Sequence, residues 1–198
     1  MLSLNAVMFD SHYTPWKLRQ FSSMFHGGGV FAYPTESVYG LGCDPWNPEA
    51  VSDLLTIKRR NPSKGLILIA SSEEQLAPFV SLRRVSDWKK MRSTGNRPIT
   101  WVVPVSEETP WWIKGNHTSV AVRITEFKPV VQLCNRVNSA LVSTSANQGG
   151  RPACRNSVSV RQLFGNQVDM LISGGTSGVS MPSEIRDFYS NRVIRAGQ

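Results

Sequence analysis

Two hydrophobic periods alternate along this chain, one typical of helices and the other of buried strands. Leu18, Phe21 and Phe25 share one face of a helix. The glycines at 27–29 end that helix, because glycine readily adopts the backbone angles that terminate one. The run at 66–70 is apolar without alternation, which predicts a central strand covered on both faces.

The same patterns predict a succession of strands and helices over the whole chain. Helices are expected at 14–26, 47–58, 85–91, 129–137 and 160–164, and Ser71 with Glu74 predicts a capping box for a further short helix. Strands are expected at 30–33, 66–70, 100–105, 120–124, 140–143, 170–172 and 192–195, and a loop at 35–45. Strands that alternate with helices favour an α/β fold with a twisted, open, mixed sheet flanked by helices.

The length of 198 residues fits one domain, which we expect to span residues 1–198. Proline-rich and glycine-rich stretches are short and scattered, and no repeat indicates a solenoid. The first residues lack a basic region followed by an apolar run, and no segment approaches the roughly 18 apolar residues that cross a membrane. We therefore expect a soluble, cytoplasmic protein that makes no membrane contact.

The charge of the chain is basic and unevenly placed. Lysine and arginine number 22 against 14 acidic residues, a net charge of +8, and the cations cluster at 58–64, 83–97 and 186–195. Such clusters predict a polyanionic ligand, either nucleotide phosphates or an RNA backbone. Solvated helix faces are the alternative, which we favour for 83–92. Three dispersed cysteines and three dispersed histidines predict neither a disulfide framework nor a protein-built metal centre.

The segment at 33–42 (YPTESVYGLG) carries the strongest polar signal. It follows a predicted strand and gathers hydroxyls, a carboxylate and two glycines. Small-molecule sites of α/β proteins lie at such strand ends, where Gly40 and Gly42 would let the backbone approach a ligand. An ordinary solvated loop between a strand and a helix is the alternative.

Other predicted loops carry cations and small hydroxyl residues. Lys58 and Arg60 would place an ammonium and a guanidinium near one anionic group, and residues 143–147 (STSAN) either add hydroxyls to that site or form a plain turn. Arg123 lies in a predicted strand and needs a partner, for which a substrate carboxylate and an internal acidic residue are equally favoured. No P-loop, dinucleotide fingerprint or nucleophile elbow occurs, and the S-x-x-K match at 86–89 has no companion motif. The loops therefore predict binding of phosphates and a carboxylate without a covalent enzyme intermediate.

Taken in order, these segments resemble the YrdC/TsaC family of threonylcarbamoyl-AMP synthases, in its short bacterial form. The resemblance rests on an ordered set of motifs at 33–42, 58–60, 64–70, 98–100, 120–123, 141–147 with Gly150, 182–187 and 195–197. This chain departs from the family at two basic segments. The family usually has proline directly after its K-x-R, where this chain has Asn61 and then Pro62. Asn96-Arg97-Pro98 stands where the family commonly has Pro-Gly-Pro.

The resemblance implies a YrdC-like domain with a central basic cavity that condenses L-threonine, bicarbonate and ATP, accompanied by Mg²⁺, into threonylcarbamoyl-AMP and pyrophosphate. The product would feed threonylcarbamoyl-transfer proteins of the TsaB, TsaD and TsaE type, which modify tRNA to threonylcarbamoyladenosine. By motif match, Lys58 and Arg60 are the catalytic cations, and no residue is a metal ligand. The residues implied to bind threonine are Thr35, Arg123, Ser143 and Ser183. Those implied to bind the nucleotide are Lys58, Arg60, Thr100, Ser145, Asn147 and Arg195.

Two other functions stay open at this stage. A non-catalytic module could bind double-stranded RNA or tRNA through phosphate contacts, although the hydroxyl and amide groups at 143–147 are unnecessary for that. Direct tRNA contact is also compatible with a synthase. A carbamoyl-transfer domain like those of hydrogenase maturation proteins would share the fold, but it normally lies within a longer chain. The six tryptophans, including those at 111–112, are expected in core and loop packing.

Overall fold

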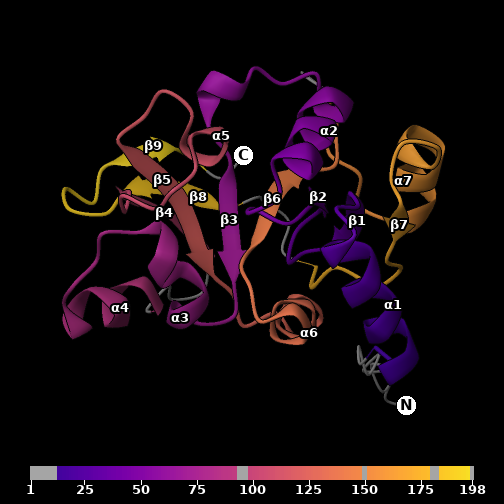
Figure 1. Ribbon diagram of the computed structural model, residues 1–198, viewed down its shortest axis with the longest axis horizontal. Coiled ribbons are helices and arrows are strands. Elements are labelled where there is room, and N and C mark those ends of the chain that lie inside the picture. Colours follow the sequence, from indigo (N-terminus) through magenta and orange to yellow (C-terminus); the bar gives the residue numbers. More distant parts are fainter. Residues whose placement is uncertain (1–12, 93–97, 149–150, 179–182, 197–198) are drawn as a thin grey trace, which may run out of the picture.

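The computed structural model describes residues 13–92, 98–148, 151–178 and 183–196, in which nine strands form one open sheet (Figure 1). The strand order is β7-β1-β2-β6-β3-β5-β4-β8-β9, with parallel and antiparallel pairs. The bounds are β1 Phe31–Pro34, β2 Tyr39–Gly42, β3 Ile67–Ala70, β4 Ile99–Pro104, β5 Ser119–Ile124, β6 Leu141–Ser145, β7 Met170–Leu171, β8 Glu184–Asp187 and β9 Val193–Arg195. The predicted α/β fold with an open, mixed sheet is confirmed.

β3 lies at the centre of the sheet, as its apolar pattern predicts. It runs parallel to β5 and antiparallel to β6. Leu68, Ile69 and Ala70 are fully buried. The register places Ser143 of β6 beside Ile67 and Arg123 of β5 beside Ile69. Two residues that are far apart in the sequence therefore flank the same short central strand.

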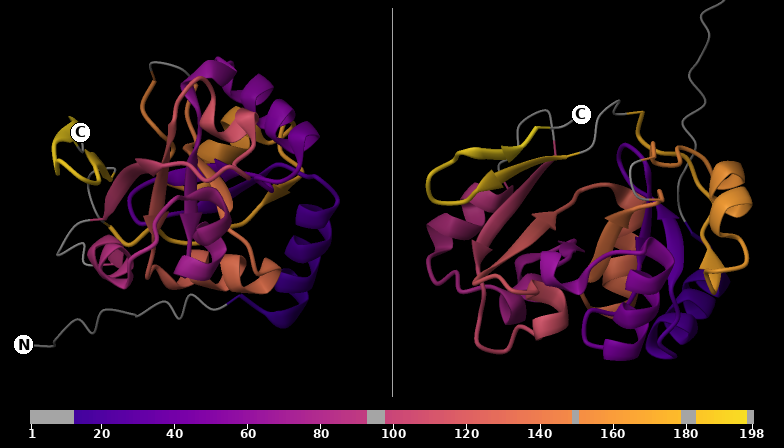
Figure 2. Two further views of the ribbon diagram at one scale, coloured as in Figure 1. Left: turned by 60° about the vertical axis from the view of Figure 1, so that its left-hand side comes forward. Right: turned by 90° about the horizontal axis from the view of Figure 1, so that it is seen from above.

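Helices cover the sheet, and Figure 2 shows them from two further sides. The α-helices are α1 Pro15–His26, α2 Pro48–Lys58, α3 Glu73–Leu76, α4 Val85–Arg92, α5 Trp111–Lys114, α6 Lys128–Val137 and α7 Ser157–Phe164; the 3-10 helices are η1 Pro62–Lys64 and η2 Ala77–Phe79. α6 packs against α1 and against β1 and β3. In the described ranges, none of these helices has the length and apolarity needed to cross a membrane.

Side-chain caps fix the starts of the two best-predicted helices. The side chain of Thr14 accepts a hydrogen bond from the Lys17 amide at the start of α1, and that of Asn47 accepts one from the Ala50 amide at the start of α2. Each cap satisfies an amide that has no partner within its helix, and such a cap typically contributes about 1 kcal/mol. Because α2 is held at its start, its last residue, Lys58, has a defined position.

Two apolar clusters hold the helices to the sheet. The larger gathers residues of α2, β2, β3, β4 and β5, among them Leu54 and Val122. The smaller lies between α1, α6 and β1, where Phe21 and Phe31 meet edge to face with ring centroids 5.0 Å apart. Full burial of one such side chain is worth about 1.5–3 kcal/mol. The strands that end at the cavity described below are therefore rigidly supported.

The expected loop at 35–45 is wrong, because it contains β2. β1 and β2 form an antiparallel hairpin in which Tyr33 pairs with Gly40. β2 lacks a side-chain period because two of its four residues are glycines. A Cβ on Gly42 would lie 2.6 Å from the carbonyl oxygen of Val142, so glycine is required for that close approach. β8 was also missed, since its sequence, EIRD, has little apolar character.

Two local predictions fail at single side chains. Ser71 and Glu74 do not form a capping box: the N-cap of α3 is Ser72, and the Ser71 amide and hydroxyl instead donate to Oε1 of Gln75. Trp111 is 60% exposed, so it does not pack in the core. Trp112, by contrast, packs against the larger apolar cluster as expected, and its Nε1 donates to the carbonyl oxygen of Pro45 at 3.1 Å.

Candidate active site

A cavity of about 720 Å³ opens where the ends of β1, β2, β6 and β8 meet β4 and β5. It is lined by nine of the ten predicted site residues, namely Thr35, Arg60, Thr100, Arg123, Ser143, Ser145, Asn147, Ser183 and Arg195. The tenth, Lys58, bonds to two of them. Side chains from distant parts of the sequence therefore converge on one basic hollow, as the motif order predicts.

Lys58 is the last residue of α2 and is anchored to the loop after β6. Its Nζ donates to the carbonyl oxygens of Ser145 and Asn147 at 2.6 and 2.5 Å, and to Oδ1 of Asn147 at 2.6 Å. The Ser145 hydroxyl donates to the same Oδ1 at 2.9 Å. Burial, together with the nearby Arg60 guanidinium, lowers the pKa of Lys58 to about 8. The ammonium thus fixes the conformation of the loop after β6, which contains Ser145 and Asn147, at the cavity wall.

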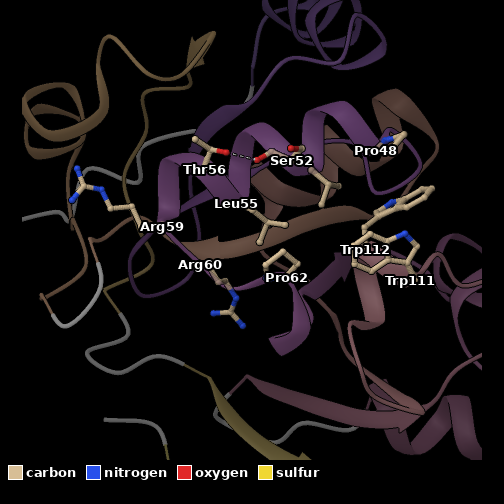
Figure 3. A pocket seen from close by; sticks show the side chains of 10 residues that line it. Pro48, Ser52, Leu55, Thr56, Arg59, Arg60, Pro62, Trp111 and Trp112 are labelled. Carbon is tan, nitrogen blue, oxygen red and sulfur yellow. Dashed lines mark hydrogen bonds between the residues drawn. The ribbon is translucent and has the colours of Figure 1, made fainter.

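Arg60 is turned toward the cavity by the residue before it. Arg59 caps α2 in the left-handed conformation, with φ of 48°, and Figure 3 shows the two arginine side chains diverging from the end of the helix. One terminal nitrogen of Arg60 donates to the carbonyl oxygen of Gly65 at 2.9 Å. Its buried Nε has no hydrogen-bond partner among the described residues. Burial, reinforced by Arg195, lowers the pKa of Arg60.

Asn61 takes the place of the usual family proline without disrupting this turn. Its side-chain oxygen accepts a hydrogen bond from the Ser63 amide at 2.9 Å and caps η1, while Pro62 stands at the first helical position. Asparagine and proline are both favoured at these positions. The insertion of Asn61 therefore leaves Arg60 in the cavity lining.

Arg123 pairs with an internal acid, the second of its two expected partners. Its terminal nitrogen lies 3.1 Å from Oε2 of Glu36, and only 9% and 13% of the two side chains is exposed. Arg123 still lines the cavity. Its buried Nε has no hydrogen-bond partner in the described part of the chain. One edge of the guanidinium is thus held by Glu36, while Nε is not engaged by the protein.

Thr35 and Ser143 line the same cavity as Arg123, and hydrogen bonds position their hydroxyl groups. The Thr35 hydroxyl donates to the carbonyl oxygen of Val38 at 2.7 Å. The Tyr33 hydroxyl donates to Oγ of Ser143 at 2.8 Å, and complete burial raises the pKa of Tyr33. Because the Ser143 oxygen is already an acceptor, its own proton is free to donate to a ligand.

Thr100 and Ser183 join the two predicted groups of residues. Their hydroxyl oxygens lie 2.8 Å apart and both side chains are buried. The resemblance assigns Thr100 to the nucleotide and Ser183 to threonine, so this contact marks the place where two ligands would meet. Buried hydroxyls of this kind are nearly always hydrogen-bonded.

Sequence reasoning missed several cavity residues. Lys64, although noted in the basic cluster, was given no role, and Lys114, His117 and Arg151 were not identified. Lys114 lies in α5, an element without a clear sequence signal. Arg97, Gly150, Pro182 and Gly197, which carry other motif positions, lie outside the described residues.

The basic segment at 83–92 lies outside the cavity lining, in agreement with the prediction of a solvated helix face. Arg83, Arg84 and Lys89 are exposed, and Arg92 pairs with Glu73 at 2.8 Å. Lys90 differs, because its ammonium donates to the carbonyl oxygen of Phe188. This segment contributes no residue to the cavity lining.

A second hollow of about 620 Å³ lies beside α2 (Figure 3). Apolar side chains, including Val51, Leu55 and Trp112, form most of its wall. Of the predicted site residues it contains Arg60 alone. Nine of the ten predicted site residues line the larger cavity, so we place the chemistry there.

The described residues offer no cluster suited to holding a metal ion. No group of three histidine, cysteine, aspartate or glutamate side chains occurs in these ranges. The described lining of the larger cavity includes neither aspartate nor glutamate. Magnesium prefers carboxylate, phosphate and water oxygens. The cavity residues therefore do not form a magnesium site by themselves.

Comparisons with known proteins agree with the geometry. The Sua5/YciO/YrdC family model, described as "Telomere recombination", matches residues 23–197. Threonylcarbamoyl-AMP synthase from Photobacterium profundum is 42% identical over 91% of this chain and 98% of the relative. The enzyme of that name from Pseudomonas fluorescens Pf0-1 is 44% identical over 91% of this chain and 97% of the relative.

A solved structure extends the likeness to three dimensions. The chain superposes on P. abyssi Sua5 complexed with L-threonine with a TM-score of 0.81 and 28% identity. The match covers 89% of this chain and 52% of that chain, so this chain spans about half the length of that structure. The matched family model covers most of the sequence and includes nearly all the motifs of the cavity. The chain belongs to the Sua5/YciO/YrdC family.

Proposed function

We propose that this protein is an L-threonylcarbamoyladenylate synthase, a nucleotidyltransferase that forms threonylcarbamoyl-AMP and pyrophosphate from L-threonine, bicarbonate and ATP. The observation that carries the proposal is the convergence of nine motif residues on one basic cavity. The names of relatives that are 42–44% identical over most of this chain support it, as does the threonine complex of Sua5.

The reaction requires alignment of substrates and no enzyme nucleophile. The amine of threonine combines with bicarbonate to give a carbamate and water. An oxygen of the carbamate attacks the α-phosphorus of ATP, the bond from that phosphorus to the bridging oxygen breaks, and pyrophosphate leaves. Holding both substrates in one dry cavity and offsetting phosphate charge would supply most of the acceleration.

The assignment of residues follows the two ends of the cavity. Arg123 would bind the carboxylate of threonine, with the hydroxyls of Thr35, Ser143 and Ser183 completing that end. Arg60 would contact the triphosphate, and Lys58 would keep the loop after β6 in position or exchange one carbonyl for a phosphate oxygen. The remaining residues assigned to the nucleotide are Thr100, Ser145, Asn147 and Arg195.

We propose that Mg²⁺ arrives bound to ATP. With no carboxylate in the described lining, phosphate oxygens and water would supply its ligands. Magnesium would offset part of the phosphate charge, and the chain's own contribution would be the cations of the wall. Omission of Mg²⁺ from an ATP-binding measurement should weaken ATP and leave threonine binding unchanged.

The product places the enzyme in tRNA modification. Threonylcarbamoyl-AMP is an activated mixed anhydride, so a later transfer reaction must consume it before water does. We propose that proteins of the TsaB, TsaD and TsaE type transfer the group to tRNA in the cytoplasm, where ATP is abundant. Direct contact of this chain with tRNA is a further proposal that the basic surface would permit.

Pyrophosphate release from ATP and Mg²⁺ tests the proposal when threonine and bicarbonate are each omitted in turn. We expect release only with both present, and the same mixture with L-alanine in place of threonine is the control for the substrate hydroxyl. Tight binding of double-stranded RNA without any turnover would instead indicate a non-catalytic module.

A further inference from the structure

Arg123 differs from the other cations of the cavity in having an acidic partner. Six arginine and lysine side chains line the cavity: Arg60, Lys64, Lys114, Arg123, Arg151 and Arg195. In the described ranges, Arg123 is the one among these six that forms an ion pair with a carboxylate. The positive charge of Arg123 is therefore offset by a carboxylate, and among the described residues no carboxylate pairs with the other five cations.

The acidic partner, Glu36, lies behind Arg123. Its neighbours Thr35 and Ser37 line the cavity and Glu36 does not, because the chain bends between β1 and β2 at this point. Its Oε2 faces Arg123, and its Oε1 accepts a hydrogen bond from the hydroxyl of Thr125 at 2.5 Å. The carboxylate therefore reaches the guanidinium from the side away from the ligand space.

The backbone of Glu36 is fixed as well. Its carbonyl oxygen accepts hydrogen bonds from the amide and the hydroxyl of Ser177, at 3.0 and 2.8 Å. The next turn is held by Tyr39, whose hydroxyl donates to the carbonyl oxygen of Gly174 at 2.6 Å. With both its carboxylate and its backbone engaged, Glu36 cannot swing away when an anion approaches Arg123.

We propose that Glu36 is a positioning residue that restricts Arg123 to a singly charged carboxylate and keeps phosphate groups at the opposite end of the cavity; this rests on the proposed function. A ligand carboxylate can bond to the part of the Arg123 guanidinium that faces the cavity and is not taken by Glu36. A polyphosphate in the same place would bring several negative charges near the buried Glu36 carboxylate, and charges repel strongly where water is scarce. The paired arginine thus excludes the triphosphate without needing a narrower cavity.

Glu36→Gln tests this division of the cavity, because glutamine keeps the shape and an acceptor for Thr125 but removes the charge. We expect pyrophosphate to compete with ATP and not with threonine in the wild-type enzyme. In Glu36→Gln, pyrophosphate should compete with threonine as well as with ATP, so that a fixed pyrophosphate concentration raises the apparent Michaelis constant for threonine in the variant alone. Calorimetric titration with pyrophosphate should show one site per chain in the wild type and two in the variant.

Two further variants separate charge from structure. Glu36→Asp keeps the negative charge and should retain the wild-type inhibition pattern. Glu73→Gln removes the acid of an ion pair outside the cavity, 2.8 Å from Arg92. It should change neither the inhibition pattern of pyrophosphate nor the number of pyrophosphate sites per chain. A general loss of structure in Glu36→Gln would lower the melting temperature and weaken both substrates, whereas the proposed effect is specific to pyrophosphate and threonine.

The outcomes distinguish this inference from the proposed function. Wild-type turnover that requires threonine and bicarbonate, combined with one pyrophosphate site in Glu36→Gln, would overturn the inference and leave the function intact. A wild-type protein that binds neither threonine nor ATP would overturn the function itself. Two pyrophosphate sites in Glu36→Gln with an unchanged pattern in Glu36→Asp would support the role of the charge.

Discussion

Two parts of the cavity wall, the end of α2 and β5, hold arginines in opposite ways. At the end of α2, Arg60 bonds to a neutral carbonyl oxygen and lies near another cation, Arg195, and no carboxylate of the described ranges offsets its positive charge. On β5, Arg123 is compensated by Glu36. An uncompensated cation attracts any polyanion, whereas a paired one offers hydrogen bonds in a fixed direction. The comparison teaches that the same side chain can select a ligand by charge at one end and by geometry at the other.

Lys58→Met is expected to have the largest effect on turnover. It removes a charged group at the end of α2, near Arg60, that makes three hydrogen bonds. Each charge-assisted bond is worth about 1.5–3 kcal/mol, so turnover should fall about a hundredfold. Pyrophosphate release with all three substrates measures it. Lys89→Met, an exposed lysine of α4, is the matched control. Full activity of Lys58→Met would show that the loop after β6 needs no anchor.

Arg123→Ala should affect the other end, raising the Michaelis constant for threonine about tenfold and leaving that for ATP unchanged. It also leaves the carboxylate of Glu36 without a cation, with only the Thr125 hydroxyl bonded to it, which should lower the free energy of unfolding by about 3 kcal/mol. Denaturant unfolding of Arg123→Ala, of Glu36→Gln and of the double variant checks the second effect. The double variant should regain stability relative to Arg123→Ala but not threonine affinity. Equal losses of threonine and ATP affinity would contradict the assignment of Arg123 to threonine alone.

The pH dependence should follow Lys58, whose pKa is lowered from 10.5 to about 8. Activity should decline above pH 8, by about tenfold per unit at most, as the ammonium loses its proton. The unfolded chain holds that proton up to its ordinary pKa, so between pH 8 and 10.5 this group makes the free energy of unfolding rise with pH. The contribution of Lys58 is measured as the difference in unfolding free energy between wild type and Lys58→Met at several pH values in this window. A difference that does not change with pH would contradict the lowered pKa.

Thr100→Val should have the smallest effect, because it removes one neutral hydrogen bond, that to Ser183. A loss of about 1 kcal/mol in stability is expected. Since the pair lies where the two ligands meet, both Michaelis constants should rise by a similar factor of about five. Steady-state kinetics in each substrate shows this. A change confined to ATP would move Ser183 out of the threonine end.

The sequence predicts best what is encoded locally. α2 and β3 follow from periodicity and caps within a dozen residues, and their predicted positions are confirmed. β2 could not be identified because Gly40 and Gly42 have no side chains to form a pattern. The motif residues reach one cavity because they lie in or beside strands of one sheet and at the end of α2, so their order along the chain carries spatial information.

The partners within the site could not be predicted, since they are far apart along the chain. Lys58 and Ser145 are separated by 87 positions, and Glu36 and Thr125 by 89. The sequence alone left the partner of Arg123 open between a ligand and an internal acid. Only the register of β5 and the hairpin at 31–42 bring Glu36 to it.

A crystal structure with L-threonine and α,β-methylene ATP bound, an analogue that cannot release pyrophosphate, would test the division of the cavity most directly. We predict the threonine carboxylate on Arg123, the triphosphate against Arg60, and the amine of threonine facing the α-phosphorus. A triphosphate seated on Arg123, or the two ligands in separate hollows, would contradict it.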